Sequence, residues 1–187
     1  RRVGIVFQDP DDQLFMPTVR DDVAFGPANL GLTGAEVDAR VETALAVVGM
    51  GEFADRPPHH LSFGQRRRVA IATVLAMEPE ILILDEPTSN LDPTSRRELA
   101  EILEALPVTV LMVTHDLPYA AQLCERSVVL HDGVIAVDGP AAVMDDLPPS
   151  RGVVRDPVQI AFAVADVRVG QRVPALPVLL FRDRDRD

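Results

Sequence analysis

Three short runs rich in apolar residues, at Val3–Phe7, Ile81–Leu84 and Val108–Val113, stand out in the pattern of hydrophobic and polar positions. Runs of this length without polar alternation are typical of strands in a parallel sheet covered on both faces. Helical periodicity separates the second run from the third. The pattern therefore predicts an α/β fold built on a parallel sheet.

The stretch from Gln8 to His60 contains helical periodicity and loops but no further run of the strand type. A helix is expected over residues 34–48, where apolar side chains recur at every third or fourth position. Thr33 and Glu36 match a capping box at its start. We therefore expect a helical lobe over residues 9–60, inserted between two strands of the sheet.

The last third of the chain contains one hairpin signal and then changes in composition. Residues 127–131 and 134–138 flank Asp132-Gly133, a dipeptide typical of tight β-hairpins. Further on, prolines and scattered arginines replace the apolar pattern. We expect one domain over residues 1–149, followed by a peripheral extension of unknown role over residues 150–187.

Charge and composition exclude some classes of function. The chain has a formal net charge of −11 and contains no lysine. The acidic balance argues against nucleic-acid binding, which needs a basic surface to displace counterions. A P-loop, G-x-x-x-x-G-K-[ST], needs its lysine, so residues 26–33, with Leu32 at that position, are not expected to form one. A single cysteine, Cys124, favours a reducing compartment.

The candidate functional residues all follow a strand or open a helix. Asp85 and Glu86 end the second apolar run, Gln8 follows the first and His115 follows the third. Parallel sheets bind ligands at the carboxyl ends of their strands, and paired acids there suit Mg²⁺ and an attacking water. The turn at residues 61–65 opens a long helix expected at 66–77, whose N-terminal amides suit a nucleotide phosphate.

The order and spacing of these motifs resemble the nucleotide-binding subunits of ABC transporters over roughly positions 1–140. The glutamine loop of that family corresponds to residues 8–15, its signature to 61–65 and its Walker B motif to 81–86. The resemblance implies an ABC ATPase fold with a P-loop NTPase-like core. The P-loop of the family precedes the glutamine loop, so this fold is expected to be N-terminally truncated here.

The resemblance also implies a role for each candidate residue. Asp85 and Gln8 would hold Mg²⁺, Glu86 would deprotonate the attacking water, and His115 would contact the γ-phosphate of ATP. Gln8 would also sense that phosphate. A second ATPase subunit, identical or different, would share the site. The residues expected to bind its nucleotide across the dimer interface are Ser62, Phe63, Gly64, Gln65 and Asp92.

A narrower resemblance lies in residues 6–15, 18–19 and 22–31, which look like the ATPases of energy-coupling-factor importers of cobalt, nickel or vitamins. It implies that residues 11–25, with Phe15 and Phe25, contact an integral membrane subunit. The chain would then be a peripheral protein at the cytoplasmic face of the cell membrane. No apolar run approaches the roughly 20 residues of a membrane span, so any membrane contact is expected through that partner.

Two other interpretations stay open. The chain could be a noncatalytic module that lends only its signature face to a complete partner ATPase. It could also belong to a soluble ABC ATPase outside transport, which the acidic charge and the resemblance at residues 6–31 argue against.

Arg66, Arg67 and Arg68 are expected to solvate a helix and to pair with nearby acids.

Overall fold

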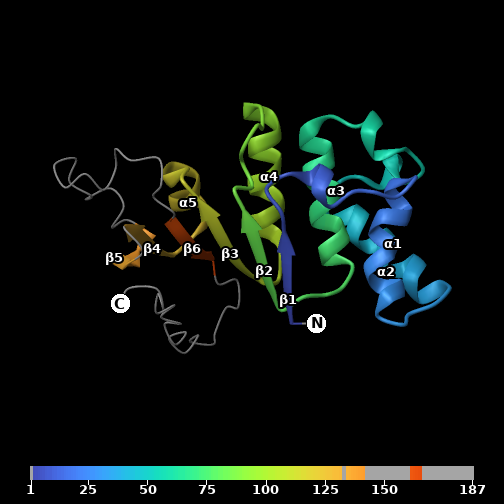
Figure 1. The fold of residues 1–187 in the computed structure, drawn as a ribbon, viewed down its shortest axis with the longest axis horizontal. Helices are drawn as coiled ribbons and strands as arrows, with labels where there is room; N and C mark the ends of the chain where they lie inside the picture. Colours follow the sequence, from blue (N-terminus) through green and yellow to red (C-terminus); the bar gives the residue numbers. More distant parts are fainter. Residues whose placement is uncertain (1, 132–133, 142–160, 166–187) are drawn as a thin grey trace, which may run out of the picture.

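The computed structural model describes residues 2–131, 134–141 and 161–165. A mixed sheet forms the centre, and helices α1, α2 and α3 gather beside strand β1 at one end of it (Figure 1). In chain order the elements are β1 Val3–Val6, η1 Pro10–Asp12, α1 Val19–Asn29, α2 Ala35–Val47, η2 Gly51–Phe53, η3 Pro58–His60, α3 Phe63–Leu75, β2 Ile81–Asp85, α4 Pro93–Ala105, β3 Thr109–Thr114, α5 Leu117–Leu123, β4 Arg126–His131, β5 Val134–Pro140 and β6 Ala161–Ala165.

The three predicted parallel strands pair as expected. β2 lies between β1 and β3, and Val6, Leu84 and Met112 are register partners across the three strands. Leu84 and Met112 are completely buried, as their apolar runs predict. The α/β class and the parallel core are thus confirmed, with strand bounds within one residue of the expected ones.

The prediction that helices cover both faces of the parallel sheet is wrong for β1. Its residues alternate between exposed and buried, and Val3 and Ile5 are 50% and 51% exposed. β1 is the edge strand of the sheet, and α3 packs on the face that carries Gly4. A Cβ atom at Gly4 would lie 2.2 Å from Cγ1 of Val74, so this close packing requires glycine.

Residues 9–60 form the predicted helical lobe, without a strand. Helix α2 matches its expected range and buries Val41 and Leu45. The predicted capping box at its start is wrong, because Gly34 is the N-cap, at a φ of 51°, and no side chain caps the helix. Residues 26–33, whose glycine spacing is that of a P-loop without the lysine, begin inside α1 and follow no strand. This position is the one expected of a segment that is not a P-loop.

The far end of the sheet is antiparallel. β4 and β5 pair as the predicted hairpin, whose turn at residues 132–133 lies outside the described residues. β6 pairs with β3 and β4 within the sheet, so a peripheral position is wrong for residues 161–165, whose uninterrupted apolar sequence favours a strand. The rest of the 150–187 extension is outside the described residues. None of the helices in the described residues combines the length and the hydropathy of a membrane span.

Candidate active site

Glu86 is held at the end of β2 by its neighbours from β3. Its Oε2 accepts a hydrogen bond from the Thr114 hydroxyl at 3.1 Å, and its Oε1 accepts one from the His115 amide at 3.0 Å. The chain turns sharply here, because Glu86 has a φ of 42°, in the left-handed region that is costly for a residue with a side chain. The structure therefore brings together the two residues that the sequence predicts to be catalytic.

The imidazole of His115 completes this arrangement. Its Nδ1 lies 2.7 Å from Oε1 of Glu86. A carboxylate at that distance favours the proton on Nδ1, which leaves Nε2 as the nitrogen available to a ligand. The His115 side chain is 70% exposed and that of Glu86 is 17% exposed. The pair thus consists of a largely buried acid and a ring that faces outward.

Sequence reasoning missed the polar residues behind this pair. The Thr114 hydroxyl, which donates to Glu86, accepts a hydrogen bond from the Asp116 amide at 3.0 Å. Asp116 caps α5 and forms an ion pair with Arg96. A possible signal was present in the sequence, because an aspartate followed by Leu117-Pro118 is typical of a helix start.

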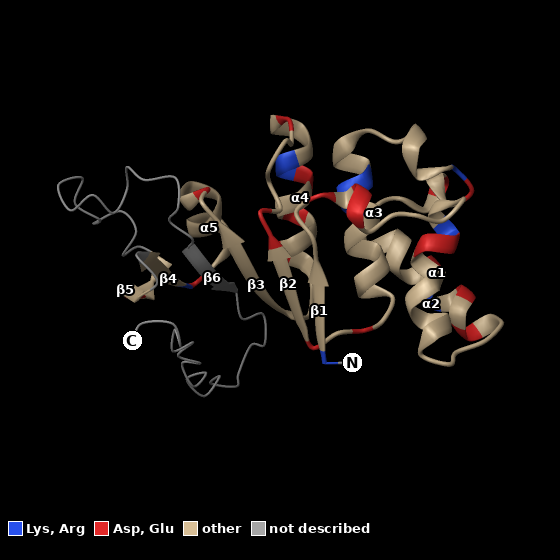
Figure 2. Cartoon of the chain, in the orientation of Figure 1, with Lys and Arg blue, Asp and Glu red and all other residues tan. Residues whose placement is uncertain are grey.

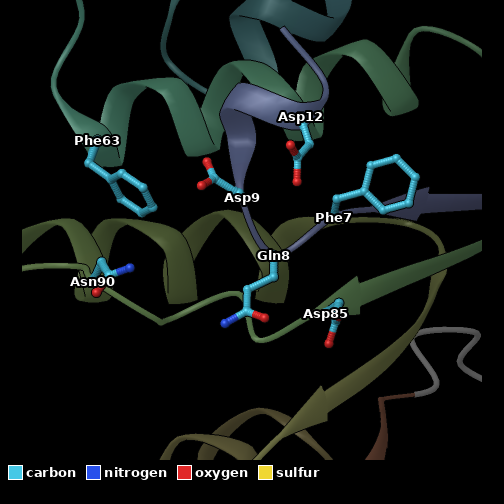
Figure 3. A pocket seen from close by; sticks show the side chains of 7 residues that line it. All are labelled: Phe7, Gln8, Asp9, Asp12, Phe63, Asp85 and Asn90. Carbon is cyan, nitrogen blue, oxygen red and sulfur yellow. The ribbon is translucent and has the colours of Figure 1, made fainter.

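Gln8 and Asp85 line one open cavity of about 550 Å³ (Figure 3). The Gln8 side chain points away from α3, to the side where Asp85 lies, whereas Phe63 and Asp9 lie toward α3. Exposed carboxylate and amide oxygens are hard ligands of the kind Mg²⁺ prefers. The described residues contain no group of three or more His, Cys, Asp or Glu side chains that could hold a metal ion.

The signature turn belongs to α3 itself. The helix begins at Phe63, three residues earlier than expected, because Ser62 and Gln65 form a reciprocal capping box. The backbone N–H of Gln65 donates to the Ser62 hydroxyl at 3.2 Å. The amides of Phe63 and Gly64 lie in the first turn, where no carbonyl of the helix can accept from them. This helix end can therefore bind an anion.

Asp92 lies next to the signature turn through a close contact between two helices. A Cβ atom at Gly64 would lie 2.5 Å from Oγ of Ser95, in the first turn of α4. Asp92 caps α4 by accepting from the amides of Thr94 and Ser95. Its hydrogen bonds with Ser95 lower the pKa of Asp92. The two segments predicted to face a second subunit thus form one continuous surface.

The three consecutive arginines of α3 do not behave alike. In Figure 2, acidic residues lie at the ends of β1 and β2, and basic residues lie in the first turns of α3 and α4. Arg66 pairs with Asp11 and Arg68 with Glu98, as the expected pairing with nearby acids requires. Arg67 contradicts the expectation of a solvated side chain, because it is completely buried. Charge pattern alone does not reveal which arginine a neighbouring loop covers.

Comparisons with known proteins identify relatives of this chain. Residues 1–89 match the family model described as ABC transporter. A Streptomyces coelicolor protein named as an ABC transporter ATP-binding protein is 75% identical over 150 residues, covering 79% of this chain and 58% of that protein. Residues 1–89 thus carry the domain of the ABC transporter family, and the chain is similar to ATP-binding proteins of these transporters.

Relatives with more specific names are also similar to the chain. The energy-coupling factor transporter ATP-binding protein EcfA of Methanocaldococcus jannaschii is 48% identical over 155 residues, covering 81% of this chain and 56% of the relative. The solved structure of CbiO1 from Clostridium perfringens, part of the ABC transporter complex CbiONQ, is 41% identical with a TM-score of 0.72, covering 82% of this chain and 61% of that one. The chain therefore spans little more than half the length of the curated relatives it matches.

Proposed function

We propose that this chain is part of the ATPase subunit of a membrane importer, in which ATP hydrolysis drives uptake of cobalt, nickel or a vitamin. The observation that carries the proposal is the Glu86 carboxylate, which Thr114 and His115 hold at the same sheet edge as Asp85. Because the relatives extend well beyond the region they share with this chain, the activity is proposed for the full-length product of the gene.

Glu86 acts as the general base in this proposal. The Thr114 hydroxyl and the His115 amide fix the plane of its carboxylate, so that it can accept a proton from a water on the exposed side. A positioned base of this kind contributes typically about 10²–10⁴ in rate. His115 directs Nε2 toward the phosphate that the water attacks, while Nδ1 stays with Glu86.

Asp85 and Gln8 hold the metal in this proposal. Their oxygens line the cavity beside Glu86, and both side chains are exposed enough to exchange water for a ligand. Bound Mg²⁺ neutralises charge on the transferred phosphoryl group. The amides at the start of α3, with the Ser62 hydroxyl, bind the nucleotide of the second ATPase subunit. Asp92 faces the same subunit.

The membrane subunit docks on the helical lobe. A groove of about 350 Å³ lies there, lined by residues that include Phe15, Leu14 and Pro58. Phe15 is 64% exposed and Phe25 is 44% exposed, and their rings meet edge to face at 5.0 Å. Exposed aromatic pairs beside a groove are typical of interface anchors. Docking here places the chain at the cytoplasmic face of the membrane as a peripheral subunit.

The proposal is tested with Glu86→Gln in the full-length gene product. The amide keeps the shape of the side chain but cannot accept the proton, so turnover should fall at least a hundredfold while Mg-ATP binding is retained. Glu101→Gln, at an exposed position of α4, is the matched control and should hydrolyse ATP at the wild-type rate. Wild-type turnover by Glu86→Gln would contradict the assignment. A wild-type protein that binds a partner ATPase but never hydrolyses ATP would favour the noncatalytic module.

A further inference from the structure

Arg67 is a buried charge without a direct carboxylate partner. Its side chain is completely buried, and no ion pair connects it to an acid in the described part of the chain. Burial lowers its pKa, and only the more distant charges of Asp9 and Asp85 oppose that shift. Burying an arginine in this way is costly unless its donors are used. The contacts of this guanidinium therefore need an explanation.

Those contacts are with the main chain at the start of the glutamine loop, at Gln8 and at Phe7 just before it. Nη1 of Arg67 donates to the carbonyl of Phe7 at 2.8 Å, and Nη2 donates to the carbonyl of Gln8. Its guanidinium carbon also lies 5.4 Å from the ring centroid of Phe63, in the first turn of the same helix. One side chain thus connects the signature turn to the backbone of the residue that faces Asp85.

A second side chain attaches the other part of the loop. Oε1 of Gln13 accepts from the Phe7 amide at 3.2 Å, while its Nε2 donates to the Ala70 carbonyl and the Thr73 hydroxyl. Loop residues 7–13 are therefore fastened to α3 at both ends. Arg67 is the side chain that donates to the carbonyl of Gln8 itself, whose own side chain is exposed.

We infer that Arg67 is a positioning residue. Its guanidinium holds the main chain of Phe7 and Gln8, so that Gln8 can ligate Mg²⁺ beside Asp85. Arg67 also couples this loop to the signature turn. The inference rests on the proposed function, because it assigns Gln8 to the metal. Residues that orient a metal ligand typically change metal affinity or activity by about 10–100-fold when they are removed.

The test compares Arg67→Met with Arg68→Met in the full-length gene product. Arg68→Met removes the same charge from the next position, where the arginine is 18% exposed and pairs with Glu98 of α4 and not with the loop. Hydrogen exchange followed by mass spectrometry measures the amides of residues 7–13, and the concentration of Mg²⁺ giving half-maximal ATP hydrolysis is measured separately. Arg67→Met should speed exchange in that segment and raise the Mg²⁺ requirement about tenfold or more, without changing exchange in β2 and β3. Arg68→Met should change neither quantity.

Arg67→Lys replaces Arg67→Met if the latter does not fold. A single ammonium can reach one carbonyl but not both in the fork geometry of arginine, so intermediate values are expected. Faster exchange with an unchanged Mg²⁺ requirement, or no change in either, overturns the inference. If the wild-type protein shows no Mg-ATP turnover, the proposed function fails instead, and unaltered exchange in Arg67→Met still overturns the hold of Arg67 on the loop.

Discussion

The candidate residues at the carboxyl ends of β2 and β3 differ from those on the surface of the helical lobe in how far the chain itself holds them. At the carboxyl end of the sheet, Glu86 receives hydrogen bonds from Thr114, the last residue of β3, and from His115 directly after it. On the lobe, Phe15 and Phe25 contact each other but remain largely exposed. The difference fits the roles proposed for the two regions, because a group that acts on a small ligand must be oriented by its own chain, whereas an interface anchor is covered only when its partner binds.

The signature turn combines both arrangements. Ser62 and Gln65 orient it within the chain through the capping box, yet Ser62 is exposed. The close contact between Gly64 and Ser95 joins the turn to the Asp92 segment. The surface proposed to face a second ATPase subunit is therefore held by contacts within the chain, whereas the surface proposed to face the membrane subunit is an open groove.

Among substitutions of residues that support the two regions, the largest expected effect comes from removing the hydroxyl that supports Glu86. Thr114→Val deletes the hydroxyl that donates to Glu86 and accepts from the Asp116 amide. A hydrogen bond to a charged group is worth about 1.5–3 kcal/mol, which corresponds to about ten- to hundredfold in rate. We expect kcat for ATP hydrolysis by the full-length protein to fall by that factor, with nucleotide affinity unchanged. Thr114→Ser keeps the hydroxyl and should retain most of the activity; equal losses in the two variants would show that the hydroxyl is not what matters.

A smaller effect is expected from crowding the contact between α3 and α4. Gly64→Ala places a methyl group 2.5 Å from Oγ and 2.8 Å from Cβ of Ser95, so one helix must shift. Such overpacking costs about 1–3 kcal/mol. We expect a lower midpoint in denaturant, and Gly51→Ala is the matched control because a Cβ atom there meets no atom within 4 Å. Adding Ser95→Gly should recover part of the loss, and a Gly64→Ala protein as stable as wild type would disprove the close contact.

The smallest effect on the isolated protein is expected at the docking groove. Phe15→Ala removes a ring that is 64% exposed, so the free energy of unfolding should change by no more than about 0.5 kcal/mol. Copurification with the membrane subunit should nevertheless weaken, since aromatic anchors dominate interfaces. Val47→Ala, at an exposed apolar position of α2, is the control and should copurify normally. A lowered melting temperature with unchanged affinity for the partner would instead assign Phe15 to the core.

The sequence predicted the regular elements, and the positions of the candidate residues within them, better than it predicted their surroundings. Apolar runs located the three parallel strands, and Glu86 and His115 were correctly placed at strand ends. Exposure of one face of β1 could not be predicted, because an apolar run looks the same whether or not a helix covers both sides. Helix α3 was expected to start too late, since the Ser62–Gln65 pair was interpreted as a turn for a ligand and not as a cap.

Arg67 shows a further limit of sequence reasoning. Three adjacent arginines form a pattern that favours solvent, and two of them do pair with acids. The third donates to carbonyls of a loop about sixty positions away in the chain. Backbone acceptors leave no trace in the sequence, because every residue has a carbonyl group. Contacts of this kind are found only when the fold brings the two segments together.

The register of the parallel strands has a consequence for how this site tolerates insertions and deletions. Val6, Leu84 and Met112 form one row across the sheet, and Gln8, Glu86 and Thr114 each follow a member of that row by two positions. Neighbouring strands lie about 4.8 Å apart, so this equal offset brings Gln8, Glu86 and Thr114 to the same level at the carboxyl end of the sheet. Losing one residue within β2 would shift Glu86 by about 3.3 Å along the strand and reverse the face to which its side chain points. Length changes should therefore be tolerated in the connections between the elements, while the short strands keep a constant number of residues.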